Sequence, residues 1–172
     1  MPEEIEESNL VEDFKEIIAT DDTLRIREFL NDQNISDVAE LINELPEYES
    51  QIIGNMNVHR AVGVFKILDL STQKDIIHEL PPYKTAELLN ELPADDRTAF
   101  LEELPSEVVK ELIRLLNPEE RKITLSLLGY PDGSVGRLMT PDYIAVQVDW
   151  NVQEVLDHIR EVGKNSETID VI

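Results

Sequence analysis

The sequence predicts a mainly α-helical fold in which short helices stack into a solenoid. Three observations support this prediction: adjacent apolar pairs repeat every twelve residues, an apolar residue follows most pairs at a distance of three, and prolines follow several of these residues. Successive pairs are twelve residues apart, except for one step of eleven residues. The nine pairs are Ile17-Ile18, Phe29-Leu30, Leu41-Ile42, Ile52-Ile53, Val64-Phe65, Ile76-Ile77, Leu88-Leu89, Phe100-Leu101 and Leu112-Ile113.

Each repeat has the pattern of one short helix followed by a tight turn. An apolar pair with a third apolar residue three positions later marks one face of a helix. The residue before a proline is pushed out of the α region, while proline suits the first helical turn, so Pro81, Pro93 and Pro105 each separate two helices. Helices of about ten residues are marginal alone and need stacked neighbours. An irregular helical bundle remains the alternative.

The helix boundaries follow from N-cap residues, turns and prolines. Helix one is expected over residues 8–19, and a turn at residues 55–57 separates helix four from helix five. The N-cap candidates are Asp21, Asp22 and Thr23 for helix two, Asn34 or Ser36 for helix three, and Ser71 for helix six. Prolines introduce the fourth, seventh, eighth, ninth and tenth helices, at Pro46, Pro82, Pro93, Pro105 and Pro118 respectively. The tenth helix is expected to end near residue 128. Gly54 and Gly63 are expected to allow close approach of neighbouring helices.

The character of the chain changes after residue 128. Residues 129–140 hold half of the six glycines and are interpreted as a linker. In residues 141–172, a strand is expected at 143–148 and a second strand at 169–172. Between them Asn151 is expected to cap a helix that runs to about residue 162, with Trp150 and Val155 as a hydrophobic staple. Such a strand–helix–strand fragment has too little core to stand alone, so we expect the chain to be part of a longer protein.

Charge and composition narrow the function classes. The net charge is −22, which argues against nucleic acid and anionic membrane surfaces and leaves cations or basic partners. Residues 1–50 hold 16 acidic and 3 basic side chains, typical either of a solvated face or of a surface that collects divalent ions. The absence of cysteine excludes disulfides and thiolate chemistry. No apolar run is long enough to span a bilayer, and the acidic N-terminus is unlike a signal peptide.

No catalytic constellation is found, and we expect the protein not to be an enzyme. Ser71-x-x-Lys74 matches a serine-nucleophile motif but lacks its partner motifs. The three histidines have no spacing that suits zinc. Residues 133–136 lack the lysine of a phosphate-binding loop and favour a flexible linker.

The motif Gly136-Arg137-Leu138-Met139-Thr140-Pro141, placed directly after the repeat, resembles the start of a CBS domain. The whole chain is similar to the cytosolic part of MgtE-type magnesium transporters: residues 1–128 to the helical N domain, and residues 141–172 to the first part of a CBS repeat. The resemblance implies a right-handed superhelix of about ten helices followed by a partial α+β CBS fragment. It also implies a homodimeric membrane protein in which this region, on the cytoplasmic side, senses Mg²⁺, draws the N and CBS domains together and closes the pore.

The resemblance also implies candidate metal ligands. Asp95 and Asp96 match acidic positions that face the CBS domain, and the backbone carbonyl at Gly136 is a further candidate. Two other acidic positions of the family are Ala99 and Gly63 here. Without a metal, Asp95 and Asp96 are equally well explained as an N-cap and a first-turn acid that complements the helix dipole.

Mg²⁺ is therefore the expected regulatory and transported ion, with the protein's own CBS and transmembrane domains as partners. Two alternatives remain. One is a helical interaction scaffold like the flagellar switch protein FliG, which gives no reason for the CBS-like motif. The other is an adenine-nucleotide-sensing CBS protein, in which ATP binds the complete CBS pair.

Overall fold

The structure is a computed structural model that describes residues 10–141 and 143–163. Its helices are α1 (Leu10–Ile18), α2 (Thr23–Asp32), α3 (Ile35–Glu44), α4 (Glu49–Asn55), α5 (Val58–Ile67), α6 (Leu70–Glu79), α7 (Pro82–Glu91), α8 (Ala94–Glu102), α9 (Ser106–Leu115), α10 (Pro118–Leu128), α11 (Val135–Leu138) and α12 (Val152–Val162). A 3-10 turn, Pro46–Tyr48, leads into α4. The fold is mainly helical, as predicted.

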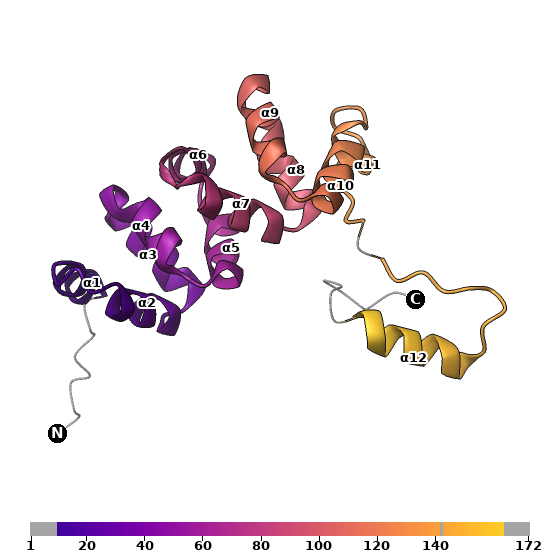
Figure 1. Cartoon of the computed structure of the whole chain (residues 1–172), viewed down its shortest axis with the longest axis horizontal. Coiled ribbons are helices and arrows are strands. Elements are labelled where there is room, and N and C mark those ends of the chain that lie inside the picture. Colours follow the sequence, from indigo (N-terminus) through magenta and orange to yellow (C-terminus); the bar gives the residue numbers. More distant parts are fainter. Residues whose placement is uncertain (1–9, 142, 164–172) are drawn as a thin grey trace.

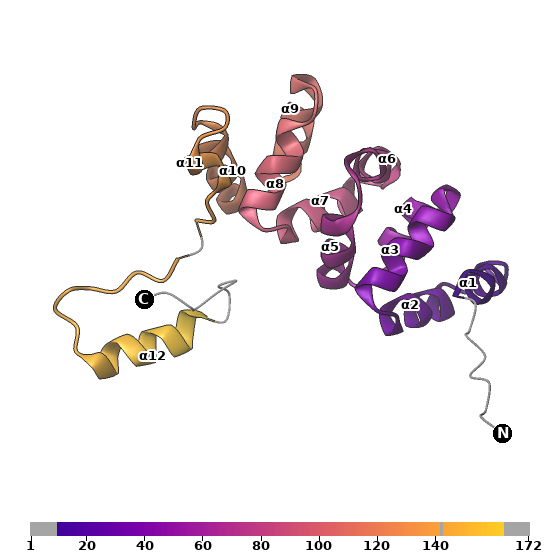
Figure 2. The ribbon, with the colours of Figure 1, turned by 180° about the vertical axis from the view of Figure 1, so that it is seen from behind.

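The helices α1 to α10 follow one another in an arc, with α12 set apart at the end of an extended segment (Figure 1). Figure 2 shows the same order from behind. Most helices pack on the helix two places further along the chain: α1 on α3, α2 on α4, α3 on α5, α4 on α6, α5 on α7, α7 on α9 and α8 on α10. The stability of each short helix therefore depends on its neighbours, as expected for helices too short to be stable alone.

The repeated apolar pairs form a continuous core. From Phe29-Leu30 onward, at least one residue of every pair is buried, while Ile17-Ile18 is half-buried against the same cluster. Aromatic contacts link distant repeats. The rings of Phe65 in α5 and Phe100 in α8 pack edge to face, with their centroids 5.4 Å apart. The twelve-residue pattern thus predicted which side chains face inward.

Most helix starts lie within one residue of their prediction. Asp22 caps α2 by accepting hydrogen bonds from two backbone N–H groups, and Asn151 caps α12 in a complete capping box with Glu154. The expected Ser71 cap is wrong, because Leu70 is already helical and Asp69 accepts the N–H groups of Ser71 and Thr72. At α3 Asn34 holds the N-cap position without a side-chain cap bond.

Residues 129–138 are more ordered than a flexible linker would be. They contain the short helix α11, which packs on α8 and α10. The Arg137 guanidinium donates to the carbonyl oxygens of Tyr130 and Leu128 and pairs with Asp132 and Glu102. A Cβ at Gly136 would lie 2.6 Å from the Tyr130 ring, so only glycine fits there without displacing it.

The strand expected at 143–148 is not formed in the described residues. The segment has no ladder partner and turns at Val148-Asp149, with Tyr143 and Val148 exposed. A strand needs a neighbour to satisfy its backbone, and the second expected strand, 169–172, lies outside the described residues. None of the helices in the described residues is long and apolar enough to cross a membrane.

Candidate functional site

The two aspartates singled out by the sequence lie in the first turn of α8. Pro93 holds the N-cap position and provides no side-chain cap, so Asp95 and Asp96 are the acidic groups next to the positive end of the helix dipole. Both residues are half-buried. Asp95 Oδ1 is buried and has no hydrogen-bond partner in the part of the chain that is described. This oxygen therefore has an unmet capacity to accept a hydrogen bond or a cation.

Asp96 has a partner on another helix. Its Oδ2 lies 2.6 Å from Nζ of Lys66, near the end of α5. Lys66 and Asp96 both line a surface hollow of about 420 Å³ between α5, α6 and α8, and Phe65 and Phe100 also line it. The acidic turn is therefore partly neutralised by the protein itself.

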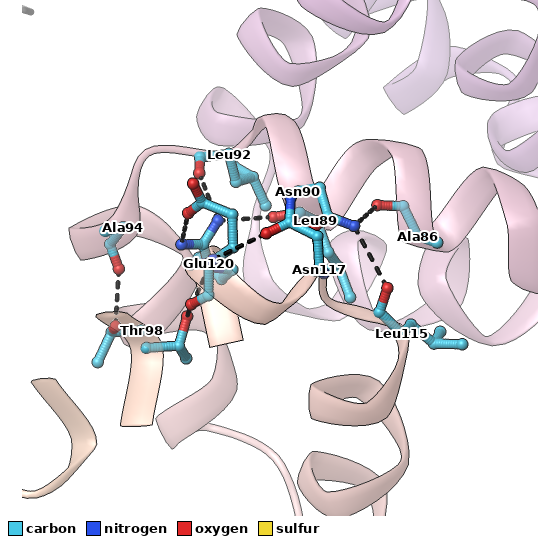
Figure 3. A network of polar contacts seen from close by, with 11 residues as sticks. Ala86, Leu89, Asn90, Leu92, Ala94, Thr98, Leu115, Asn117 and Glu120 are labelled. Carbon is cyan, nitrogen blue, oxygen red and sulfur yellow. Dashed lines mark hydrogen bonds and ion pairs between the residues drawn. The ribbon is translucent and has the colours of Figure 1, made fainter. Parts of the chain in front are cut away.

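The residue after the aspartates fixes this turn in place. Arg97 is fully buried, and its Nη1 donates to the carbonyl oxygens of Leu89 and Leu92 at 3.0 and 2.9 Å. Its Nε donates to Thr124 Oγ1 at 2.8 Å, and Nη2 pairs with Glu120, both on α10. Figure 3 shows this network around Leu89, Leu92 and Glu120. The first turn of α8 is thereby held against the end of α7 and the start of α10.

Arg97 belongs to a polar series that the apolar pattern did not reveal. The fourth residue of α6, α7, α8 and α10 donates to carbonyl oxygens at the end of the preceding helix, five or eight residues earlier. These residues are Gln73, Thr85, Arg97 and Arg121. Each satisfies carbonyls that a helix end leaves without partners. The signal was present in the sequence as polar residues in twelve-residue register, interrupted at Val109.

The structure does not bring Gly136 to the aspartates. Gly136 lies in α11, beside Arg137, which pairs with Glu102 in the last turn of α8. Seven residues separate Asp95 from Glu102, or about 10 Å along a helix axis. The backbone at Gly136 packs on the Tyr130 ring at the far end of α8.

The two positions where the family pattern has further acids offer no ligand here. Ala99 is exposed on α8. A Cβ at Gly63 would lie 2.7 Å from Ile35 Cδ1, so this position packs α5 on α3, as expected for close helix approach. Among the described residues, no group of three or more histidines or carboxylates is placed to hold a metal ion. The start of α8 fits a cation through Asp95 alone and needs oxygen ligands from elsewhere to complete a site.

A separate carboxyl group is buried in the N-terminal half of the helix row. Glu49, the first residue of α4, is 7% exposed. Burial raises the pKa of this carboxyl group, and the nearby charges of Asp75, Glu79 and Asp69 raise it further. This group is an unfavourable charge at neutral pH.

Comparison with known proteins places the chain in a family. Residues 8–133 match the family model described as the MgtE intracellular N domain. The chain belongs to this family. Membership places this region on the cytoplasmic side of the membrane and confirms the MgtE-type resemblance.

Relatives of the MgtE family agree in sequence and structure. The chain is 30% identical over 167 residues to the magnesium transporter MgtE of Thermus thermophilus, covering 95% of this chain and 37% of that protein. A crystal structure described as the cytosolic domain of the Mg²⁺ channel MgtE in complex with ATP superposes with a TM-score of 0.82 at 30% identity, covering 92% of this chain and 66% of that one. The soluble part of a magnesium transporter matches with a TM-score of 0.75 at 20% identity, covering 93% of this chain and 64% of that one, which shows the shared fold. The chain thus spans little more than a third of the transporter's length.

Proposed function

We propose that this chain is the Mg²⁺-sensing cytosolic region of a magnesium transporter and that it gates a membrane pore. The observation that supports this most is the likeness to the cytosolic domain of the Mg²⁺ channel MgtE along nearly the whole chain. In this proposal residues 1–128 are the N domain, a right-handed superhelix, residues 129–140 join it to the next module, and residues 141–172 begin a CBS domain. The complete protein is a homodimer.

The proposed sensor depends on repulsion between carboxylates, which a bound Mg²⁺ ion reverses. Two carboxylates about 5 Å apart at an effective dielectric of 20 repel each other by roughly 3 kcal/mol. Without Mg²⁺, acidic groups that face each other across the joint between the N and CBS domains keep it open. Mg²⁺ takes oxygen ligands, keeps several waters and is typically held by one or two carboxylates, so a weak site is sufficient. The bound ion converts repulsion into attraction and favours the closed arrangement.

Asp95 is the N-domain ligand in this proposal. Its Oδ1 is the unpartnered oxygen in the first turn of α8, while Asp96 already pairs with Lys66. The opposing ligands come from the CBS side. A carboxylate at a helix N-terminus also stabilises the helix, so the metal role adds to the structural role of Asp95.

The proposal is tested by Mg²⁺ titration of a chain that continues through the complete CBS pair. Millimolar Mg²⁺ is expected to lower the radius of gyration and raise the melting temperature, measured against NaCl of matched ionic strength. Asp95→Asn weakens this response, whereas Glu107→Gln, an equal charge change at an exposed first-turn acid of α9, leaves it unchanged. An unaltered radius of gyration and melting temperature up to tens of millimolar Mg²⁺ would contradict the sensor.

One observation favours a second ligand. The solved relative with 30% identity is described as a complex with ATP. We therefore propose that the complete CBS pair of this protein binds an adenine nucleotide. Equilibrium dialysis with ATP against GTP tests this, and equal retention of the two nucleotides, or of neither, would exclude it.

A further inference from the structure

A lysine pairs with one of the two aspartates at the position where Mg²⁺ is expected. Lys66 Nζ, from α5, lies 2.6 Å from Asp96 Oδ2 in the first turn of α8. We propose that Lys66 is a tethered competitor for Mg²⁺ at this turn and raises the Mg²⁺ concentration at which it responds. This inference rests on the proposed function, because it concerns the regulation of the same acidic turn.

The ion pair is placed where a solvent ion can reach it. The Lys66 and Asp96 side chains are 34% and 37% exposed, and both line the hollow of about 420 Å³ between α5, α6 and α8. A partly exposed ion pair is a weak interaction that solvent ions can exchange with. The ammonium group is therefore displaceable, and it differs in this respect from the buried guanidinium of Arg97, which has neighbours on α7 and α10.

The two aspartates consequently have different roles. Asp95 Oδ1 is without a hydrogen-bond partner in the described part of the chain, whereas Asp96 is neutralised by an ammonium group on the same molecule. The turn presents close to one uncompensated negative charge instead of two. Mg²⁺ is usually held by only one or two carboxylates. Neutralising one of the two carboxylates in this turn therefore removes a large part of the protein's contribution to Mg²⁺ binding.

The electrostatic repulsion between the Lys66 ammonium group and Mg²⁺ sets the size of the expected change in Mg²⁺ affinity. A doubly charged and a singly charged cation about 5 Å apart in a water-like dielectric repel each other enough to change an affinity on the order of tenfold. Removal of the lysine charge is therefore expected to lower the Mg²⁺ midpoint by about this factor. An arginine at this position keeps the charge and is expected to keep the midpoint.

The test follows the α8 turn by Mg²⁺ titration of the chain continued through the complete CBS pair, monitored through the backbone amide NMR signals of residues 94–98. The variants are Lys66→Gln, Lys66→Met as an apolar residue of similar length, and Lys66→Arg. Lys110→Gln is the matched control, because it also removes a lysine that pairs with a carboxylate, Glu107, but on α9. Titrations are run at constant ionic strength, and melting without Mg²⁺ checks that each variant is folded.

The outcomes separate this inference from the proposed function. A midpoint about tenfold lower in Lys66→Gln and Lys66→Met, with Lys66→Arg and Lys110→Gln unchanged, supports the competitor. A response to Mg²⁺ only after the lysine charge is removed supports it as well. If the unaltered chain responds through Asp95 and the Lys66 variants have the same midpoint, the competitor is excluded while the sensor stands. If neither the unaltered chain nor any variant responds at 20 mM Mg²⁺, both the Lys66 competitor and the Mg²⁺ sensor are excluded at this turn.

Discussion

Arg97 and Glu120 form an ion pair that joins α8 to α10 beneath the acidic turn, and the guanidinium is completely buried. The same guanidinium satisfies two carbonyl oxygens at the end of α7. A single side chain thus links three successive parts of the helix row. Its loss leaves a carboxylate and two carbonyl groups without their partner.

We therefore expect Arg97→Ala to lower the free energy of unfolding by about 3 kcal/mol, the lower end of the cost of breaking a buried pair, because Glu120 stays partly exposed. Urea unfolding monitored by circular dichroism measures this. Arg160→Ala is the control, since Arg160 pairs with Asp157 on the surface of α12 and surface pairs contribute little. Similar losses in both variants would mean that the Arg97 network adds nothing beyond a surface ion pair.

Asn90 is expected to stabilise the junction between α7 and α10. Its Oδ1 accepts the backbone N–H of Asn117 at 2.8 Å, and its Nδ2 donates to the carbonyl oxygens of Ala86 and Leu115. Figure 3 shows these contacts. Asn90→Ala is expected to cost about 1–2 kcal/mol of unfolding free energy, because it leaves backbone groups of another segment unpaired.

The chain supplies both a repeat of this contact and a control. Asn31 at the end of α2 accepts the N–H of Asn57 in the same way, so Asn31→Ala should have a similar effect. Within residues 10–141 and 143–163, the Asn55 side chain bonds only to Gln51 in its own helix, and Asn55→Ala should cost less. Equal unfolding midpoints for Asn55→Ala and Asn90→Ala would contradict the role of the cross-helix bond.

Glu49 is expected to make the fold less stable as pH rises. Its folded-state pKa is raised from the ordinary value of 4.5, so the native state keeps a proton that the unfolded chain has already lost. The native state binds more protons, so unfolding free energy falls as pH increases from about 4.5 through the folded-state pKa. Glu49→Gln should raise the melting temperature at pH 7 and leave it nearly unchanged at pH 4.

The control for this pH effect is Glu107→Gln, which removes an exposed carboxylate that pairs with Lys110. A melting-temperature difference between Glu49→Gln and the unaltered chain that does not vary from pH 4 to pH 7 would show that Glu49 is not the titrating group.

The sequence predicted the row of helices and its core because apolar pairs at a fixed spacing report directly on one helix face. It placed the Asp95-Asp96 turn at the start of a helix because Pro93 comes directly before it. Lys66 was not linked to Asp96, because thirty residues separate them and only the packing of α5 beside α8 brings them together. Arg97 was overlooked because arginine is usually a surface residue, and its burial depends on carbonyl groups of two other helices. The strand at 143–148 was predicted from local pattern, whereas a strand forms only with a partner.

The final prediction concerns the place where the chain bends after the helix row. Arg137 holds α11 on the end of α8 through Glu102, with further bonds to Asp132 and the carbonyl oxygens of Tyr130 and Leu128. The hydrogen bond and charge of Glu102 also raise the pKa of the Arg137 guanidinium, so this side chain keeps its positive charge at neutral pH. We therefore expect residues 129–138 to move with the N domain and bending to begin after Leu138.

Hydrogen exchange measured by mass spectrometry tests this directly. Arg137→Ala should speed amide exchange in residues 130–138 and leave α3 to α5 unaffected, and Gly136→Ala should do the same by displacing Tyr130. The charge-exchanged pair Arg137→Glu with Glu102→Arg should restore part of the protection, because it reverses the ion pair without removing it. Rapid exchange of residues 130–138 already in the unaltered chain would place the bend at Gly129 instead, as the glycine content alone had suggested.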